Sequence, residues 1–226
     1  MSKKEKIEIN ESQNKLDTTW YKDALLVVFD WYGTCFYIKK WIRGRFSKEL
    51  NHILQTNDIW FDQIVKGKLE YNWKVFKISR GDIKRMKKNL ASVSAYEDFE
   101  DNIQYLHDTW HKTAICSNLA QPYIEPIENE EIVKKWCFDH KFYSCKIWCR
   151  KPNPLIFQKI IEESGVSADK IVFVWDSFKS DIEWASGAWM KVVLIDRQYE
   201  GNAKNIEKEW INLIIIHTLD QLKEIF

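Results

Sequence analysis

The chain has 226 residues and a formal net charge of +1, and 30% of its residues are charged. This length suits one domain, or a core domain with a smaller insert, and the near-neutral charge gives no reason to expect nucleic acid or an anionic membrane as a partner. The five cysteines form no CxxC pair, and neither a signal segment nor an apolar run of about 20 residues is present, so we expect a cytoplasmic protein with reduced thiols.

The first part of the chain predicts a disordered tail followed by a buried strand. Residues 1–20 are polar and lack periodicity. The apolar run at residues 25–29 ends at Asp30, and such runs are typical of strands buried on both faces of a parallel sheet. Further strand runs lie at residues 113–116, 171–174, 191–195 and 213–216, and helical patterns lie at residues 154–164, 180–188 and 219–226. This alternation predicts an α/β fold with a doubly wound parallel sheet.

Residues 36–106 break the alternation of strands and helices. They contain no clear strand run and show the pattern of amphipathic helices, for example at residues 45–54 and 82–90. An insert directly after the first strand would lie over the strand ends. We therefore expect a helical cap domain at residues 36–106 and a core domain formed by residues 21–35 and 107–226. A basic run at residues 84–88 is interpreted as the solvent-exposed face of a helix.

Polar side chains follow the predicted strands, and a further lysine precedes a predicted helix. The carboxyl ends of parallel strands are where open α/β sheets bind their ligands. Carboxylates suit a hard cation such as Mg²⁺, and a lysine together with a hydroxyl suits a phosphoryl group. The residues concerned are Asp30, Ser117, Asn118, Lys151, Asp176 and Asp181.

Each of these residues also has an ordinary structural interpretation. A single Asp at a strand end is more often a helix cap or a turn residue. Ser117 and Asn118 alone would be assigned to a loop or a helix N-cap, and Lys151 alone to the surface. It is their order and placement together that predict a site.

Four segments resemble, in chain order, the four motifs of the haloacid dehalogenase superfamily. Residues 29–34 (FDWYGT) are similar to motif one, usually DxDGT, and residues 115–118 (ICSN) are similar to motif two. Residues 150–154 (RKPNP) resemble the motif-three lysine in its KPxP setting. Asp176, Ser177 and Asp181 resemble motif four, usually GDSxxxD. The resemblance covers about residues 24–195 and implies a Rossmann-like core with an inserted cap.

The resemblance also implies a role for each matched residue. Asp30 would attack phosphorus to give an aspartyl-phosphate, and Asp181 would brace Lys151 or the water shell of a bound Mg²⁺. The backbone carbonyl of Tyr32 would be a metal ligand, and Thr34 would steady the motif-one loop beside the substrate. The implied catalytic residues are Asp30, Lys151 and Asp181, the implied substrate-binding residues are Thr34, Ser117, Asn118 and Lys151, and the implied Mg²⁺ ligands are Asp30, Tyr32 and Asp176.

Tyr32 departs from the phosphatase pattern. Phosphatases of the superfamily have a second Asp here, a general acid of the kind worth about 10²–10⁴-fold in rate. The motif DxYGT instead resembles 2-haloacid dehalogenases, whose halide leaving group needs no proton. Asp176 instead favours a phosphatase, because those dehalogenases lack an acidic metal ligand in motif four.

Tryptophan replaces glycine at several motif positions. The chain has 12 Trp and only 7 Gly. Relatives carry Gly where this chain has Trp110, Trp175, Trp184 and Trp189, and glycine serves turns that need positive φ or a close backbone approach. An aromatic-rich core is the ordinary interpretation. Our hypothesis is that a codon read as Gly in the source organism, with UGA as the candidate, is translated here as Trp.

The sequence therefore favours a Mg²⁺-dependent phosphatase of a small phosphorylated metabolite, with the cap closing over the substrate. One alternative is a metal-independent 2-haloacid dehalogenase in which Arg43 or Arg45 holds the substrate carboxylate. The other alternative is a catalytically impaired member of the superfamily that acts as a binding protein.

Overall fold

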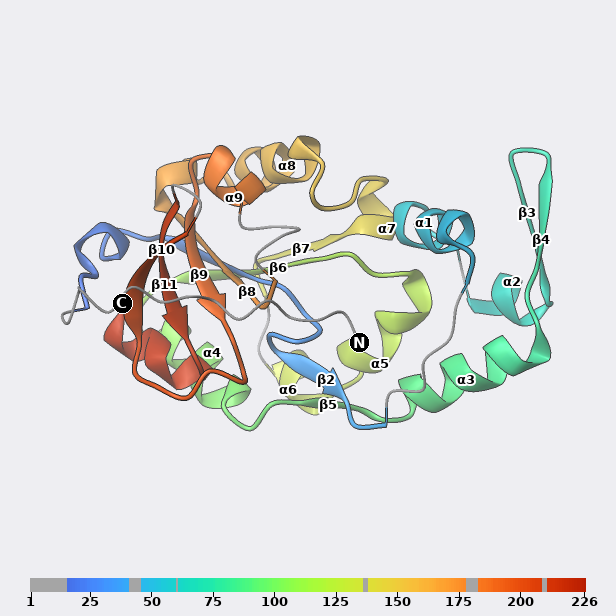
Figure 1. The fold of residues 1–226 in the computed structure, drawn as a ribbon, viewed down its shortest axis with the longest axis horizontal. Coiled ribbons are helices and arrows are strands. Elements are labelled where there is room, and N and C mark those ends of the chain that lie inside the picture. Colours follow the sequence, from blue (N-terminus) through green and yellow to red (C-terminus); the bar gives the residue numbers. More distant parts are fainter. Residues whose placement is uncertain (1–15, 41–45, 60, 136–137, 178–182, 209–210) are drawn as a thin grey trace.

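The computed structural model describes residues 16–40, 46–59, 61–135, 138–177, 183–208 and 211–226 (Figure 1). Of the expected N-terminal tail, these ranges include only residues 16–20, where a short 3-10 helix, η1 (Thr19–Tyr21), begins. None of the described helices is both long and apolar enough to cross a membrane.

Seven strands of the described chain form the core sheet, in the order β10-β11-β9-β8-β1-β6-β7 (Figure 1). Neighbouring strands are parallel except for the antiparallel pair β10–β11. The strands are β1 (Leu26–Phe29), β6 (Lys112–Ser117), β7 (His140–Tyr143), β8 (Ile171–Trp175), β9 (Lys191–Ile195), β10 (Lys204–Lys208) and β11 (Ile211–Ile216). β1 lies between β6 and β8, so the residues that follow it stand in the middle of the sheet edge.

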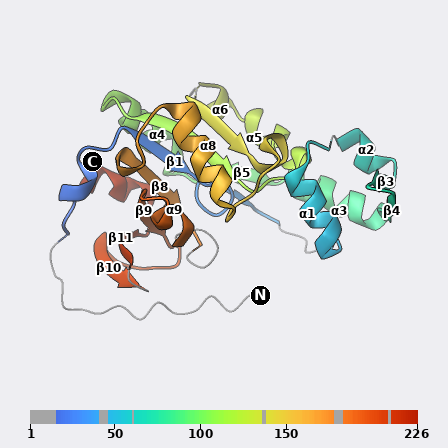
Figure 2. The same ribbon diagram turned by 90° about the horizontal axis from the view of Figure 1, so that it is seen from above.

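Helices cover both faces of this sheet (Figure 2). Because successive side chains of a strand point to opposite faces, Val27 and Phe29 of β1 join one apolar cluster, and Leu26 and Val28 join another. The first cluster includes residues of α4 (Phe99–Asp108), α5 (Glu125–Glu128) and α6 (Glu131–Lys135), and the second includes residues of α8 (Pro154–Ser164) and α9 (Glu183–Gly187). The doubly wound α/β fold expected from the sequence is confirmed.

The predicted core elements are found close to their expected positions. All the apolar runs expected to be strands are strands, and the pattern at residues 154–164 is α8. The pattern at residues 219–226 forms the 3-10 helix η5 (Leu219–Glu224) rather than an α-helix. Part of the pattern at residues 180–188 lies outside the described residues, and the rest contains α9. Short elements between the strands are η2 (Gln121–Tyr123), α7 (Ser144–Ile147) and η3 (Ala168–Lys170).

The segment after β1 has a small apolar core of its own at one end of the molecule (Figures 1 and 2). It contains α1 (Lys48–Thr56), α2 (Phe61–Val65) and α3 (Arg80–Leu90), whose apolar faces meet in one cluster. We propose that this part is the cap. It also contains strands that the sequence did not indicate: the hairpin β3 (Lys68–Tyr71) and β4 (Lys74–Lys77), and the antiparallel pair β2 (Phe36–Ile38) and β5 (Val93–Ala95).

Four tryptophans adopt a left-handed backbone, with φ of 64° at Trp73, 64° at Trp110, 57° at Trp148 and 65° at Trp189. Their side chains are 105%, 93%, 69% and 82% exposed, in the same order. A left-handed conformation disfavours every residue with a Cβ, and an exposed indole gains little from packing there. The backbone thus supports the glycine hypothesis at Trp110 and Trp189 and extends it to Trp73 and Trp148.

Trp175 differs from these four positions. It lies in β8, is buried and has no left-handed backbone, so φ does not require glycine there. The side chain of Trp184 lies outside the described residues.

Candidate active site

Asp30 stands directly after β1, at the carboxyl edge of the sheet. Its backbone N–H donates to the carbonyl of Val174 at 3.1 Å, which continues the pairing of β1 with β8 by one residue. The chain then turns sharply, because the carbonyl of Trp31 accepts from the N–H groups of both Cys35 and Phe36 at 2.9 and 2.8 Å. Trp31 itself is buried among Phe36, Phe99 and Phe138. The loop that carries Asp30 is therefore fixed to the core on both sides.

Lys151 is buried against Asp30. Its Nζ lies 3.0 Å from Oδ1 of Asp30 and 2.9 Å from the carbonyl oxygen of Cys116, and the residue is only 2% exposed. The same Nζ lies 3.4 Å from the centre of the Trp175 ring, so one face of the ammonium rests on an aromatic surface. A lysine is buried this deeply only when its charge is paired. Here the paired charge is the carboxylate of Asp30.

Asn118 holds the backbone of Lys151 in place. Its Nδ2 donates to the Lys151 carbonyl at 2.8 Å, and its Oδ1 accepts from the Lys151 N–H at 2.8 Å. Asn118 lines the cavity above the sheet, yet these two bonds make it a positioning residue for Lys151. Ser117, at the end of β6, is nearly buried and lines the same cavity as Asp30 and Lys151.

Asp176 lies against the motif-one loop. A Cβ atom placed on Gly33 would overlap the carboxylate of Asp176, and Gly33 also has a φ of 95°, so this close approach requires glycine. Asp30 and Asp176 follow neighbouring strands, since Phe29 of β1 pairs with Val174 of β8. The donors offered here are carboxylate oxygens and the adjoining backbone carbonyl of Tyr32, and an all-oxygen set of this kind fits Mg²⁺.

The described residues contain no cluster of three or more His, Cys, Asp and Glu side chains able to hold a metal. A site with two carboxylates and a carbonyl is compatible with this finding, because Mg²⁺ usually keeps several water ligands. Asp181 lies outside the described residues, as do Arg43 and Arg45.

Tyr32 lines the same cavity as Asp30, and its hydroxyl is hydrogen-bonded to the protein backbone. The hydroxyl donates to the carbonyl of Tyr123 at 3.2 Å, and the two rings meet edge to face. Burial raises the pKa of Tyr32 well above its usual value, with the Tyr123 phenol adding to the shift. Asn89 of α3 hydrogen-bonds Tyr123, so this pair of tyrosines also connects the motif-one loop to the cap. Tyr32 is a structural link and a poor proton donor.

A cavity of about 670 Å³ lies between the sheet edge and the cap. Asp30, Ser117 and Lys151 form its floor, and side chains of α1 and α3 form the opposite wall. A space of this size suits a small metabolite. The structure thus brings together Asp30, Ser117, Asn118 and Lys151 around one cavity, with Asp176 beside the motif-one loop.

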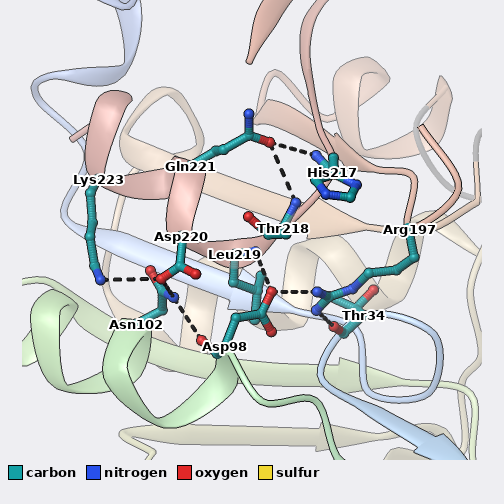
Figure 3. Close-up of polar contacts among 10 residues, drawn as sticks. All are labelled: Thr34, Asp98, Asn102, Arg197, His217, Thr218, Leu219, Asp220, Gln221 and Lys223. Carbon is teal, nitrogen blue, oxygen red and sulfur yellow. Dashed lines mark hydrogen bonds and ion pairs between the residues drawn. The ribbon is translucent and has the colours of Figure 1, made fainter. Parts of the chain in front are cut away.

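Thr34 is not among the residues that line this cavity. It is fully buried, and its hydroxyl has no hydrogen-bond partner among the described residues. Its backbone carbonyl accepts from Nη2 of Arg197 at 2.6 Å, and the same guanidinium forms an ion pair with Asp98 (Figure 3). The guanidinium also lies over the ring of Tyr96, 3.9 Å from its centre. Asp98 in turn accepts from the N–H of Leu219 at 2.8 Å.

Arg197 was not identified from the sequence. It follows β9 at the same edge of the sheet that carries Asp30 and Asp176, so the rule that selects polar residues after parallel strands applies to it as well. Its long side chain reaches the motif-one loop from the side. It is a positioning residue for the loop that carries the candidate nucleophile.

This arrangement belongs to a known class of hydrolase. The sequence profile of the haloacid dehalogenase-like hydrolase family matches residues 46–195. The chain is therefore a member of this family and a hydrolase.

The relatives of this chain include both phosphatases and dehalogenases. A glyceraldehyde 3-phosphate phosphatase of Methanothermobacter thermautotrophicus is 28% identical over 110 residues, which cover 44% of this chain and 49% of the relative. The chain thus spans about half the length of this curated relative.

Two solved structures share the fold at low sequence identity. A Bacteroides thetaiotaomicron enzyme of this family, in complex with magnesium and inorganic phosphate, is 11% identical with a TM-score of 0.56, over 78% of this chain and 96% of its own. The L-2-haloacid dehalogenase of Xanthobacter autotrophicus is 14% identical with a TM-score of 0.58, over 89% of this chain and 97% of its own.

Proposed function

We propose that the protein is a Mg²⁺-dependent phosphatase of a small phosphorylated metabolite. The observation that carries this proposal is the position of Asp176, whose carboxylate packs against the loop of Asp30 so closely that Gly33 is required between them. Asp30 and Asp176 follow neighbouring strands, and a cation held by both carboxylates would offset the repulsion between their charges. The curated phosphatase relative and the magnesium-bound family member support the same assignment.

The reaction follows from the contacts of Asp30. Lys151 holds Oδ1, which leaves Oδ2 to attack phosphorus. A bond forms between this oxygen and phosphorus, the bond to the alcohol oxygen breaks, and an aspartyl-phosphate results, while the departing alcohol oxygen takes its proton from solvent water. Water then attacks the phosphorus of that intermediate and gives up a proton to the solvent, which releases inorganic phosphate and restores the carboxylate of Asp30.

The polar groups of the cavity floor stabilise the charge on the phosphoryl group. Lys151 brings a fixed positive charge, and Ser117 brings a hydroxyl, to the place where the phosphoryl oxygens must lie. Asp30, Asp176 and the carbonyl of Tyr32 would hold Mg²⁺. When bound, the cation would offset the negative charges of carboxylate and phosphate as they meet.

The 2-haloacid dehalogenase activity is the second candidate, and Tyr32 is the observation that favours it. Its hydroxyl proton is committed to the carbonyl of Tyr123, and burial raises its pKa, so it is a weaker general acid than the usual Asp. A halide would need none. Such a reaction needs no metal ligand at Asp176, and for this reason we rank the dehalogenase activity second.

The decisive test measures phosphate release from p-nitrophenyl phosphate with Mg²⁺, with EDTA, and by an Asp30→Asn variant. We expect turnover that requires the metal and is lost in the variant. Asp101→Asn, an exposed carboxylate on α4, is the matched control and should retain activity. Halide release from 2-chloropropionate in EDTA, without phosphate release, would assign the dehalogenase activity instead. Absence of both activities would leave the binding-protein alternative.

A further inference from the structure

The cap helix α3 presents polar side chains to the cavity. Asp82, Arg85 and Asn89 line it together with Met86, and this i, i+3, i+4, i+7 spacing places all four on one face of the helix. The inward face of a surface helix is ordinarily apolar. Asn89 is bonded to Tyr123, so it is the charged pair of Asp82 and Arg85 on that face that favours a polar group in the cavity.

Arg85 is less exposed than the other basic residues of its run on α3. Lys84, Lys87 and Lys88 belong to the same basic run and are exposed, as the sequence predicted for the whole run. Arg85 is the exception, because its side chain is only 21% exposed and lines the cavity. The expectation of a solvent-exposed face over residues 84–88 was wrong at Arg85 and at the buried Met86.

Helix α1 adds two amides to the same wall. Asn51 and Gln55 line the cavity from one face of α1. The Oε1 atom of Gln55 is buried and has no hydrogen-bond partner among the described residues. Buried polar atoms are almost always paired, so an unpaired one beside a cavity indicates a ligand that donates to it. A hydroxyl group of a substrate would do so.

Arg85 retains hydrogen-bonding capacity beyond its partner. Its Nη2 contacts Oδ1 of Asp82, while Oδ2 of Asp82 accepts from the hydroxyl of Ser79 at 2.6 Å. A guanidinium has five N–H donors in a planar fork, so the remaining edge can bind a planar acceptor with two oxygens. The carboxylate of Asp82 beside it would repel a dianion such as a second phosphate more than a monoanion.

From these observations we propose that Arg85 binds a carboxylate at the end of the substrate remote from the phosphoryl group. The substrate class is then a phosphate ester of a small hydroxylated carboxylic acid. The inference rests on the proposed phosphatase function, because a phosphate ester is the substrate only if the protein is a phosphatase. The preference of Arg85 for a carboxylate is tested by binding and does not depend on turnover. Arg85 is the specificity-determining residue, Gln55 receives a substrate hydroxyl, and Asp30 with Lys151 receives the phosphoryl group.

The test compares two ligands that differ only in the proposed group. Dissociation constants for 3-phosphoglycerate and glycerol 3-phosphate are measured by calorimetry with Mg²⁺ in the Asp30→Asn protein, which binds without turnover. We expect 3-phosphoglycerate to bind about 10- to 100-fold more tightly, as charge-assisted hydrogen bonds predict. Arg85→Met in the same background should remove this preference, and Arg85→Lys should restore part of it.

The controls separate a specific contact from a general effect. Arg80→Met removes an exposed cation from the same helix and should keep the preference. Inorganic phosphate is titrated into each variant, and an equal loss of affinity for it in Arg85→Met would overturn the inference. So would equal binding of the two ligands before the substitution, or equally tight binding of propane-1,3-diol bisphosphate. Failure of the phosphatase function is a separate result, seen as absence of phosphate release by the wild-type protein.

Discussion

The ammonium of Lys151 lies 3.4 Å from the centre of the Trp175 ring. Lys151 also donates to Asp30 and to the carbonyl of Cys116, so a carboxylate, a carbonyl and a π face hold its ammonium at the edge of the cavity. The indole that contacts the active-site lysine packs on the ring of Phe173 in the same apolar cluster. Trp175 therefore helps to hold the lysine against the nucleophile.

Replacing Trp175 by leucine should lower both stability and activity. Cation–π contacts are worth up to about 2 kcal/mol when desolvated, and the smaller side chain also leaves a cavity. We expect kcat/KM for p-nitrophenyl phosphate to fall by about tenfold, with Trp175→Phe in between. Phe173→Leu is the matched control, because its ring lies 5.7 Å from the same Nζ. Equal losses of activity in Trp175→Leu and Phe173→Leu would show that packing alone is responsible.

The left-handed tryptophans predict an unusual stabilisation. Trp73→Gly, Trp110→Gly, Trp148→Gly and Trp189→Gly should each raise the free energy of unfolding by about 1 kcal/mol, because glycine adopts positive φ without steric cost. The four turns are separate, so the gains should add to about 4 kcal/mol. Urea unfolding measures the change. Trp20→Gly is the control, since Trp20 is 60% exposed but lies in η1 without a positive φ.

The same positions give a test of the coding hypothesis. At Trp73 the hairpin turn reads Asn-Trp with both φ values positive, 45° and 64°, which is the geometry that Asn-Gly normally supplies. If UGA codes for glycine in the source organism, the codons of these four residues should be UGA. Four UGG codons would refute the hypothesis. A stabilising effect of glycine would still follow from the backbone alone.

The sequence predicted the buried parts of this fold well and the exposed edges poorly. The central strands are continuous apolar runs, because both faces of β1 and β8 are covered by helices. β7 and β10 lie at the two edges of the sheet and carry lysines, so no such run marks them. The cap hairpin was missed for a related reason, since most residues of β4 are exposed and the usual glycine signal of its turn is absent.

At the site, the sequence predicted the residues that lie at the ends of the strands. It missed the residues whose long side chains extend toward the site from other elements. Asp30 and Asp176 directly follow strands and Ser117 is the last residue of one, so the topology alone brings them to one edge. Arg85 and Arg197 reach the site through long side chains from a helix and a loop. The composition around Arg85, a run of basic residues, concealed which one faces inward.

Tyr32→Asp should change which esters the enzyme hydrolyses. The wild-type hydroxyl is committed to the Tyr123 carbonyl and is a poor general acid, so esters with acidic leaving groups should be favoured. We expect the substitution to raise kcat for glycerol 3-phosphate by about tenfold or more relative to p-nitrophenyl phosphate, whose leaving group needs little protonation. Tyr32→Phe removes the bond to Tyr123 without adding an acid and should keep the wild-type ratio. An unchanged ratio in Tyr32→Asp would mean that another group supplies the proton.

Arg197→Met should loosen the loop that carries Asp30. The substitution removes the donor to the Thr34 carbonyl and leaves the carboxylate of Asp98, only 9% exposed, without its ion-pair partner (Figure 3). Breaking a buried pair from one side costs about 3 kcal/mol, which urea unfolding should detect. If Arg197 positions the loop, kcat should fall while KM changes little, because the binding groups Ser117 and Lys151 are held by other contacts. Lys223→Met breaks the exposed pair with Asp220, in the same region of the fold, and should change neither stability nor kcat measurably. A loss of stability in Arg197→Met with unchanged kcat at a temperature where the variant is folded would restrict Arg197 to a structural role.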